Sequence, residues 1–378
     1  MKILFFTGSR GEWGYIRPIL KHCKKLKIKT EICVSNMHLL PAFGSSINEI
    51  EKDNFKVNYK IYMALDGYND FTMSKSLGIF LQSFTDVLQN SKPDWLLLAG
   101  DRGETFMASV AGAYTNTPTA HIQAGELSGN IDGLARHAIG KMAHVHFASN
   151  QDAAKRLIRL GEEKKRIYKV GATQLDEIKN KSFTDKNQIR KKFNIKKNEK
   201  LIIAIFHPVT EDQKETNLNT IRIIKALEKN RCKKIWIMPN NDSGSDNIRE
   251  DILNNKNSEI SVYRNLSRED FLGLLSVASC MIGNSSSALI EAPSFQLPAI
   301  NIGRRQKNRI CGKNVITLEK VSVNQIDKLI KKIVFSDEKF LNKNISNPYG
   351  DGNSSLKIIK ILKKLQSDRH LIKKTLNL

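Results

Sequence analysis

The sequence has no long apolar segment and few cysteines. No hydrophobic run approaches the ~20 residues that a membrane-spanning helix requires, so we expect no contact with a membrane. The 378 residues include five cysteines, which are scattered and form no Cys-x-x-Cys pair. A disulfide framework is therefore not indicated, and the pattern favours reduced thiols in a cytoplasmic protein.

Short motifs that mark several enzyme classes are also missing. The chain contains neither the G-x-x-x-x-G-K-[ST] loop of P-loop nucleotidases nor the G-x-S-x-G turn of serine hydrolases. The first apolar segment leads into Gly-Ser-Arg-Gly at 8–11, which is not G-x-G-x-x-G, and no acidic residue ends the second segment at 30–34. We therefore discount a nicotinamide site. No His or Cys cluster has metal-ligand spacing, so we expect neither metal nor cofactor.

Acidic residues are scarce relative to basic ones. The chain has 61 Lys and Arg against 38 Asp and Glu, a formal net charge of +23. The excess lies mostly in Lys pairs on segments with a surface-like helical pattern, without interleaved aromatic residues or a nucleic-acid-binding motif. We interpret it as a solvated surface that helps to gather anionic substrates, and we expect no nucleic-acid partner. A basic nucleic-acid-binding protein is the alternative.

Apolar segments alternate with helical patterns along the chain. Short continuous apolar runs, typical of strands buried on both faces, lie at 2–6, 30–34, 95–99, 118–122, 145–148 and 167–170. A polar stretch follows residue 175, and similar runs then resume at 201–206, 235–238, 260–263, 280–282, 299–302 and 315–318. Segments with helical periodicity separate these runs, as in a parallel sheet built from β-α-β units.

The alternation predicts an α/β protein with two Rossmann-like, doubly wound domains that face a central cleft. We expect one domain over residues 1–175 and a second over 176–353. Apolar residues recur at helical spacing over 354–365, so we expect an amphipathic helix in the tail, about 354–378, that returns to the first domain. Ligands of such sheets bind at the carboxyl ends of the strands, so polar residues just after a strand are candidates for function.

Candidate residues in the N-terminal half follow two of the expected strands. Asp101 comes just after the run at 95–99, where a carboxylate can face the ligand; capping the next helix is its alternative role. Glu126, Asp132, Arg136 and His137 lie within twelve residues, among glycines. Because Arg136 is four residues after Asp132, the two share one face of the expected helix. We interpret this group as proton-transfer and substrate-binding residues.

In the C-terminal half, His207 follows an apolar run and precedes a proline that ends it. A histidine there is a candidate for phosphate binding or proton transfer. Ser285 and Ser286 follow the run at 280–282 and offer hydroxyl and N–H groups at a helix N-terminus. Such groups suit an anion, and simple N-capping is the alternative.

Three further residues suit a nucleotide. Glu291 lies in the next helical pattern and can accept hydrogen bonds from a diol such as ribose. Arg305 follows the run at 299–302 and adds positive charge at the same sheet edge. Arg10, after the first strand, can reach a phosphate with its forked donors, although a surface arginine in a structural turn is equally typical.

Taken together, these segments resemble the UDP-N-acetylglucosamine 2-epimerase family, specifically its hydrolysing branch, which makes N-acetylmannosamine for sialic-acid-type sugars. The resemblance covers nearly the whole chain and rests on the joint order and spacing of several motifs. They are Gly-Ser-Arg at 8–10, Gly-Asp-Arg at 100–102, His-Ile-Gln-Ala-Gly-Glu at 121–126, Ile-Asp at 131–132, Arg-His-Ala-Ile at 136–139, His-Pro-Val-Thr at 207–210, Pro-Asn at 239–240, Gly-Asn-Ser-Ser at 283–286 and Gly-Arg-Arg at 303–305.

The resemblance implies a GT-B fold that binds a UDP-sugar. The residues matching nucleotide-binding positions of the family are Arg10, His207, Asn240, Ser285, Ser286, Glu291 and Arg305. The residues matching positions linked to catalysis are Asp101, Glu126, Asp132 and His207. We add Arg102, Arg136 and His137 as expected substrate-binding residues. The expected partners are a nucleotide-sugar substrate and further copies of the chain, as a homodimer or homotetramer.

The chain departs from the family at a few residues. Many relatives have Glu where this chain has Gln123 and a second acid where it has Gly133, and the familiar Arg-Ala-Asp is replaced by Arg-Gly-Glu at 10–12. Because Gln123 cannot act as a base, we expect Asp101, Glu126 or Asp132 to do the work of the carboxylate that many relatives have at this position.

The sequence thus predicts a hydrolysing epimerase that converts UDP-GlcNAc and water to N-acetylmannosamine and UDP through a 2-acetamidoglucal. One alternative keeps the reaction and changes the sugar to a UDP- or GDP-linked 2,4-diacetamido-trideoxyhexose, as in legionaminic acid pathways. Others are a non-hydrolysing UDP-GlcNAc 2-epimerase and a GT-B glycosyltransferase, which would require an acceptor.

Overall fold

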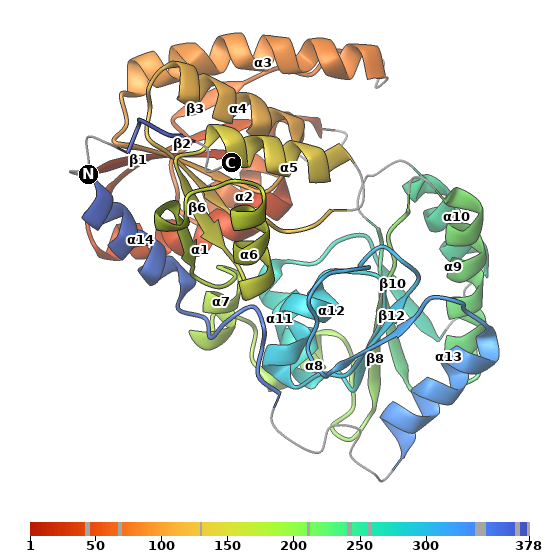
Figure 1. Ribbon diagram of the computed structural model, residues 1–378. Helices are drawn as coiled ribbons and strands as arrows, with labels where there is room; N and C mark the ends of the chain where they lie inside the picture. The colour runs from red at the N-terminus through yellow and green to blue at the C-terminus, as the bar shows by residue number, and fades with distance from the viewer. Residues whose placement is uncertain are drawn as a thin grey trace. The chain divides into compact units, whose positions relative to one another are not determined.

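The computed structural model describes residues 1–41, 46–66, 70–128, 131–209, 212–239, 244–255, 259–336, 345–366 and 371–375. The chain divides into two units (Figure 1). Unit 1 consists of Met1–Asp176 with Tyr349–Leu378, and unit 2 of Glu177–Pro348. Within the described ranges, no helix is both long and apolar enough to cross a membrane.

Unit 1 contains a seven-stranded sheet in the order β3-β2-β1-β4-β5-β6-β7, and every neighbouring pair is parallel. Its strands are β1 (Lys2–Thr7), β2 (Lys29–Ser35), β3 (Tyr59–Ile61), β4 (Trp95–Ala99), β5 (Thr119–Ile122), β6 (Val145–Ala148) and β7 (Ile167–Lys169). The chain winds from β1 to β2 and β3 on one side, and then crosses to β4 on the other. The winding direction therefore reverses between β1 and β4, which makes this pair the topological switch point of the sheet.

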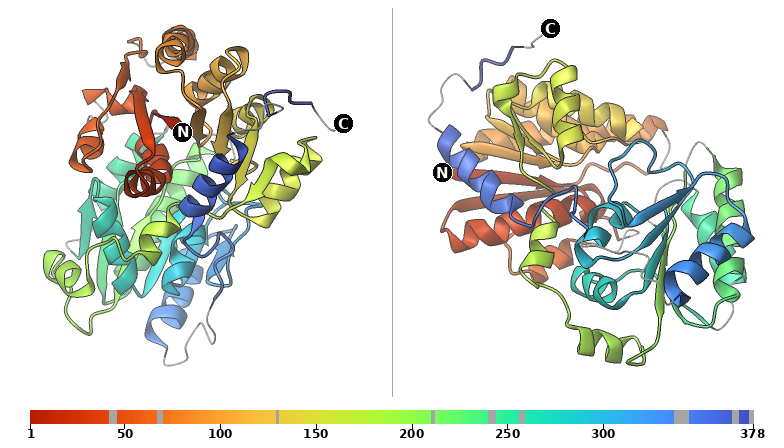
Figure 2. Two further views of the ribbon diagram at one scale, coloured as in Figure 1. Left: turned by 90° about the vertical axis from the view of Figure 1, so that its left-hand side faces the viewer. Right: turned by 60° about the horizontal axis from the view of Figure 1, so that its bottom comes forward.

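Helices cover both faces of this sheet. They are α1 (Arg10–Lys25), α2 (Ile47–Lys52), α3 (Asp70–Ser91), α4 (Gly103–Tyr114), α5 (Ile131–Met142), α6 (Gln151–Arg159) and α14 (Ser354–Leu365), with α7 (Leu175–Lys179) at the division between the units. Helices α3, α4 and α5 lie side by side (Figure 1). Helix α14, near the end of the chain, packs beside α1, the first helix of the chain (Figure 2). Both helices contribute to the same core.

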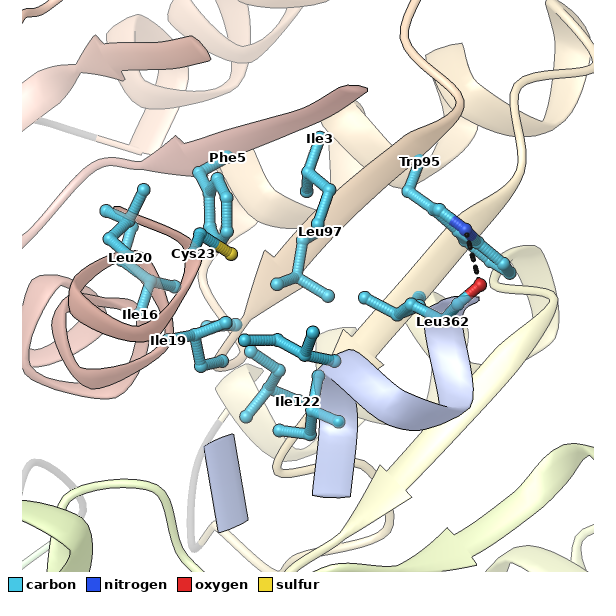
Figure 3. Packing of buried hydrophobic residues seen from close by; sticks show 14 of the residues in the cluster. Ile3, Phe5, Ile16, Ile19, Leu20, Cys23, Trp95, Leu97, Ile122 and Leu362 are labelled. Carbon is cyan, nitrogen blue, oxygen red and sulfur yellow. Dashed lines mark hydrogen bonds between the residues drawn. The ribbon is translucent and has the colours of Figure 1, made fainter. Parts of the chain in front are cut away.

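The alternation of side chains along the strands fills a separate core on each face. On one face, Phe5 of β1 and Leu97 of β4 pack with apolar residues of α1 and α14 (Figure 3). There the indole N–H of Trp95 donates to the carbonyl of Leu362, over 3.2 Å, and ties α14 to the sheet. On the other face, Phe6 packs with apolar residues of α3 and α4. This two-sided burial explains why the strands read as continuous apolar runs.

Unit 2 contains a six-stranded parallel sheet in the order β10-β9-β8-β11-β12-β13. Its strands are β8 (Leu201–Ile205), β9 (Lys233–Ile237), β10 (Ile260–Tyr263), β11 (Cys280–Gly283), β12 (Ala299–Ile302) and β13 (Val315–Leu318). Its helices are α8 (Lys186–Lys192), α9 (Gln213–Glu228), α10 (Ser245–Asn255), α11 (Arg268–Val277), α12 (Ser287–Ile290) and α13 (Val323–Ile330). By the same reasoning as in unit 1, its switch point lies between β8 and β11.

The predicted fold class, α/β with two doubly wound parallel sheets, is confirmed. Sequence reasoning missed the edge strand β3, which is only three residues long. The helical pattern that contains Glu291 is not one continuous helix, because the structure has the single turn of α12 followed by a 3-10 turn at Ala292–Phe295. The break follows from Pro293, which cannot donate the backbone hydrogen bond that would continue the helix.

Candidate functional site

Asp101 lies directly after β4, at the switch point of unit 1. Its carboxylate accepts a hydrogen bond from the hydroxyl of Ser128, over 2.6 Å, and pairs with the guanidinium of Arg136. Burial alone would raise the pKa of Asp101, but the charge of Arg136, the Ser128 hydrogen bond and the charge of Arg102 outweigh it and lower that pKa. Asp101 is therefore an ionised carboxylate at neutral pH.

The helix-capping role considered for Asp101 is not what the structure shows. Helix α4 begins at Gly103, and its N-cap is Arg102, whose side chain makes no capping hydrogen bond. The Asp101 carboxylate is turned instead toward Ser128 and Arg136. Arg102 is partly buried, and its positive charge favours the ionised form of its neighbour.

Arg136, on α5, joins Asp101 to the loop after β5. One nitrogen of its guanidinium binds Asp101 and Ser128, and the other donates to the carbonyl of Gln123 over 3.0 Å. Gln123 has a φ of +59°, a left-handed conformation that few non-glycine residues adopt. This conformation turns the Gln123 carbonyl toward Arg136, which donates to it. Gln123 therefore contributes a backbone acceptor for the arginine, and its side chain does not supply a base.

Glu126 lies in the loop that follows β5, four residues after the strand ends at Ile122. It is buried, and its Oε1 accepts hydrogen bonds from the hydroxyl of Ser149 and from Nδ2 of Asn150, the latter over 2.5 Å. Both donors follow β6, and Asn150 also caps α6 through the amide of Ala153. The ends of β4, β5 and β6 thus place two carboxylates, Asp101 and Glu126, with fixed donors at one edge of the sheet.

The helix that carries Arg136 also carries the other two predicted residues. Asp132 lies in the first turn of α5 and is partly buried. His137 is also partly buried; burial lowers its pKa, and the charges of Arg136, Arg156 and Lys141 lower it further. His137 is therefore mostly neutral at pH 7 and suits hydrogen bonding rather than anion pairing.

Two further carboxyl groups, those of Glu12 and Glu104, lie near the switch point of unit 1. Glu12 is buried on α1; its Oε2 accepts from the amides of Gly8 (2.6 Å) and Ser9 (3.1 Å), and its Oε1 accepts from the Thr105 hydroxyl (2.7 Å). Burial raises the pKa of Glu12 to about 8, and the nearby charge of Glu104 acts in the same direction. Glu12 therefore ties the loop after β1 to the start of α4.

Arg10 is the first residue of α1, where Ser9 and Glu12 form a capping box. Its Nε lies 3.0 Å from Oε1 of Glu49, and about 41% of its side chain is exposed. An exposed pair of this kind contributes little stability and exchanges readily. Arg10 therefore remains available for an anionic ligand, although no contact of the described residues assigns it that role.

Unit 2 places His207 and Ser285 at its switch point. His207 follows β8, and Ser285 follows β11, two strands that are direct neighbours. Between them lies the buried Asn284, whose Oδ1 accepts from the backbone N–H of His207 (2.7 Å) and whose Nδ2 donates to the His207 carbonyl (2.8 Å). Sequence reasoning quoted Asn284 only as part of a motif and gave it no role.

The serine cluster is not a simple helix cap. Ser286 is the N-cap of α12, but its side chain makes no capping hydrogen bond. The hydroxyl of Ser285 lies 3.3 Å from the hydroxyl and from the amide of Ser287. Because α12 is only four residues long, its dipole adds little to the hydroxyl and amide groups of this cluster.

Arg305 lies close to this cluster in space, and Glu291 lies close to it in the sequence. One nitrogen of Arg305 donates to the carbonyl of Asn284 over 3.2 Å. Glu291 is buried, and its Oε1 lies 2.8 Å from a guanidinium nitrogen of Arg268, which also binds Glu177. The carboxylate predicted to meet a ribose is thus already held by an arginine that sequence reasoning missed. Asn240 lies outside the described residues.

The family of the chain follows from comparison with known proteins. Residues 21–363 match the sequence profile of the family described as UDP-N-acetylglucosamine 2-epimerase. The chain belongs to this family. The family resemblance predicted from the motifs is therefore confirmed.

Several members of this 2-epimerase family are similar over most of their length. The UDP-N,N'-diacetylbacillosamine 2-epimerase (hydrolyzing) of Legionella pneumophila is 34% identical over 378 residues, covering 99% of this chain and 98% of that protein. The polysialic acid biosynthesis protein P7 of Escherichia coli is 32% identical, covering 96% and 93%. A UDP-N-acetylglucosamine 2-epimerase of Neisseria meningitidis serogroup B is 30% identical, covering 86% of each chain.

Solved structures share the fold. The UDP-GlcNAc 2-epimerase of Neisseria meningitidis, bound to UDP-GlcNAc, superimposes with a TM-score of 0.82 at 22% identity, covering 96% of this chain and 100% of that one. A glycosyltransferase of Rickettsia africae gives a TM-score of 0.60 at 14% identity, covering 97% and 99%. At these identities the likeness concerns the fold alone, and it confirms the predicted GT-B-like architecture.

Sequence reasoning missed the residues that hold the predicted ones in this 2-epimerase fold. Ser128, Ser149 and Asn150 donate to the two carboxylates, and Arg268 binds Glu291. Ser149 and Asn150 follow an expected strand, so the rule that selected Asp101 also points to them. Arg268 lies in an ordinary helical pattern and gave no signal.

Proposed function

We propose that the chain is a hydrolysing 2-epimerase of a UDP-linked 2-acetamido sugar. The observation that carries this proposal is the ionised carboxylate of Asp101, held by Arg136 and Ser128 at the end of β4, with Glu126 at the end of the neighbouring strand. Epimerisation at C2 requires one group to remove a proton and a group to return a proton to the opposite face. Two carboxylates at adjacent strand ends suit this task.

In the proposed first step, the bond between C1 and the diphosphate oxygen breaks, and its electron pair leaves with UDP. The C2 proton passes to a carboxylate, and the C2–H electron pair forms the C1–C2 double bond of a 2-acetamidoglucal. Departure of UDP makes C1 electron-deficient, which acidifies the neighbouring C–H. In the second step, a water oxygen bonds to C1 and gives one of its protons to a carboxylate, while the C1–C2 double-bond electron pair takes a proton from a protein acid on the opposite face of C2.

We assign proton transfer on the sugar to Asp101, Glu126 and Asp132, with Arg102, Arg136 and His137 as binding residues. The departing diphosphate requires fixed donors, since charge develops on it as the bond breaks. Ser285, Ser286 and Arg305 are the proposed donors in unit 2, with His207 as their partner and a candidate acid for the leaving oxygen. Arg10, Glu291 and Asn240 complete the proposed nucleotide contacts.

Two sugars compete as the substrate. Relatives named for N,N'-diacetylbacillosamine are 34% identical over 99% and 88% of the chain, whereas one named for N-acetylglucosamine is 30% identical over 86%. UDP-N,N'-diacetylbacillosamine is a 2,4-diacetamido-trideoxyhexose nucleotide and so represents the alternative substrate given by the sequence, and we keep it beside UDP-GlcNAc, the substrate predicted first. The GDP-linked form belongs in the same test, because one relative is named for both nucleotides.

Isotope labelling tests the reaction with each nucleotide sugar. The purified protein is incubated with each donor in D2O, and separately in H2(18)O, and the products are analysed by NMR and mass spectrometry. The proposal expects a free 2-epimeric sugar with deuterium at C2, heavy oxygen at C1 and unlabelled UDP. An epimer that is still attached to UDP would indicate a non-hydrolysing epimerase. Turnover that occurs only with an added acceptor and leaves C2–H unexchanged would indicate a glycosyltransferase, and either result overturns the proposal.

A further inference from the structure

The side chain of Asn284 extends the pairing of β8 with β11 beyond the ends of both strands. The regular register ends at Ile205 and Gly283. The amide of Asn284 then donates to the carbonyl of Ile205 over 3.1 Å. Two residues beyond Ile205, the Asn284 side chain exchanges two hydrogen bonds with the backbone of His207. A carboxamide carries one donor and one acceptor in a plane, as a peptide group does, so it replaces the next residue of a strand.

The neighbouring residues make this side chain the group that holds His207. Pro208 has no N–H to donate, so the chain after His207 cannot continue a ladder through its backbone. Gly283 has a φ of +131°, and a Cβ there would overlap the backbone of Ile205. The strand therefore turns sharply at Gly283, and this turn brings the Asn284 side chain over the end of β8.

The backbone of the same residue receives the proposed phosphate-binding arginine. The carbonyl of Asn284 accepts from Arg305 (3.2 Å) and from Nε2 of Gln306 (2.8 Å). Asn284 itself is fully buried. It is thus bonded to the segments after β8 and β12 and lies next to Ser285, so three groups assigned to the diphosphate meet at one residue.

We propose that Asn284 is the positioning residue of the proposed diphosphate site in unit 2. Asn284 sets the position of His207 through the reciprocal pair of hydrogen bonds and anchors Arg305 through its carbonyl. The inference rests on the proposed function for the roles of His207 and Arg305. The hydrogen bonds themselves do not depend on that function.

Asn284→Ala is the first variant, and Asn230→Ala is its matched control. Asn230 is equally buried in unit 2, and its Nδ2 donates to the carbonyl of Ala226 (2.8 Å) and to Asp327 (2.9 Å), away from the switch point. We expect Asn284→Ala to lower kcat by ~100-fold, the effect of an ångström-scale misplacement of a reacting group. Asn230→Ala should stay within about threefold of the wild type. In a His207→Ala background, Asn284→Ala should cost less than about threefold more, because its effect acts through His207.

Backbone hydrogen exchange at His207 gives a readout that needs no catalysis. With fragmentation that resolves single residues, the His207 amide should exchange slowly in the wild type and in Asn230→Ala, and at least ~10-fold faster in Asn284→Ala, since a hydrogen bond of ~1.5 kcal/mol is lost. Asn284→Asp keeps the acceptor and loses the donor, so it should retain slow exchange and still lower kcat. It also serves if Asn284→Ala does not fold.

The outcomes separate the two proposals. If the wild type shows no epimerase activity but His207 exchange responds as expected, the proposed function fails and the positioning role stands. If exchange at His207 is unchanged in Asn284→Ala, or if the activity losses of Asn284→Ala and His207→Ala simply multiply in the double variant, the positioning role is wrong.

Discussion

At the switch point of each sheet, a buried side chain joins the loop after one strand to a neighbouring segment, but the two side chains differ in chemistry. In unit 2, the neutral side chain of Asn284 joins the ends of β8 and β11 through the His207 backbone. In unit 1, the carboxyl of Glu12 joins the loop after β1, at Gly8, to α4, at Thr105. Each loop carries polar groups that we assign to ligand binding. A buried side chain, rather than one of those groups, makes the hydrogen bonds that hold the loop in place.

The two ties differ in their dependence on pH. An amide keeps its donor and acceptor at every pH in the working range, whereas a carboxyl gains or loses a proton. Burial and the charge of Glu104 favour the neutral form of Glu12, while its hydrogen bonds from the Gly8 amide and Thr105 oppose that shift. Unit 1, where we place the proton transfers on the sugar, thus has a titratable scaffold, and unit 2, where we place most of the nucleotide contacts, has a neutral one.

The largest expected effect separates chemistry in unit 1 from nucleotide binding in unit 2. Asp101→Asn removes the proposed base without changing its size, and kcat should fall ~10³-fold, within the range measured for general acid–base groups. UDP affinity, measured by calorimetry, should change less than about twofold, because most of the proposed nucleotide contacts belong to unit 2.

Asp152→Asn is the matched control. Asp152 also pairs with an arginine, Arg156, but on the partly exposed surface of α6. Its kcat should remain within about twofold of the wild type. A comparable loss in both variants, or a large loss of UDP affinity in Asp101→Asn, would contradict the division of roles between the units.

A smaller effect is expected at two adjacent arginines of unit 2. Arg305 donates to Asn284 beside the serine cluster, whereas Arg304 lies 3.3 Å from Glu319 with 68% of its side chain exposed. Arg305→Ala should raise the Kd for UDP by ~10-fold or more, the loss of one charge-assisted hydrogen bond. Arg304→Ala should change it by less than about twofold, and equal effects would show that only overall charge matters.

The smallest effect is a change in the pH dependence of stability. Glu12 has an ordinary pKa of 4.5 in the unfolded chain and about 8 in the folded protein. The folded state therefore binds this proton more tightly, and the associated stability is full below pH 4.5 and is lost as the pH rises through about 8. Glu12→Gln lacks this term. Between pH 5 and 8.5, the Tm of the wild type should fall relative to that of Glu12→Gln by at least ~2–4 °C, the shift per kcal/mol in a domain of this size.

Glu162→Gln provides a control of opposite sign in the same unit. Burial opposes the shift, but His146 and Lys374 lower the pKa of Glu162 to about 2. Its stabilisation is present above pH 4.5 and is lost only as the pH falls toward 2. The difference in Tm between the wild type and Glu162→Gln should thus be nearly flat from pH 5 to 8. A flat profile for Glu12→Gln as well would show that Glu12 does not hold its proton.

Much of the fold was readable because each central strand is buried on both faces. The runs at 95–99 and 201–206 are apolar throughout, and each stops at a polar residue that marks the carboxyl edge of a sheet. The three-residue edge strand β3 has a single fully buried residue, Ile61, and carries no such signal. Helix α10 was missed for a similar reason, since few of its residues are buried.

Candidate residues were selected by two signals in the sequence. Asp101 and His207 follow an expected strand, and Glu126 lies in a cluster of charges. The partners Arg268 and Ser128 were not found, because they reach the site from a helix and a loop whose spacing is unremarkable. The assignment of Asp101, Glu126, Asp132 and His207 to catalysis remains a prediction.

The amino-acid sequence by itself determined the order of the central strands and of most helices, the family and the polar residues available at the strand ends. These depend on local burial and on residue type, which a linear pattern records. Only the tertiary structure decided which of those polar groups are bonded to one another: Arg136 to Asp101, Arg268 to Glu291 and Asn284 to His207. Such pairs join residues 23 to 77 apart, and the crossover between strands brings them together at distances that no local pattern encodes.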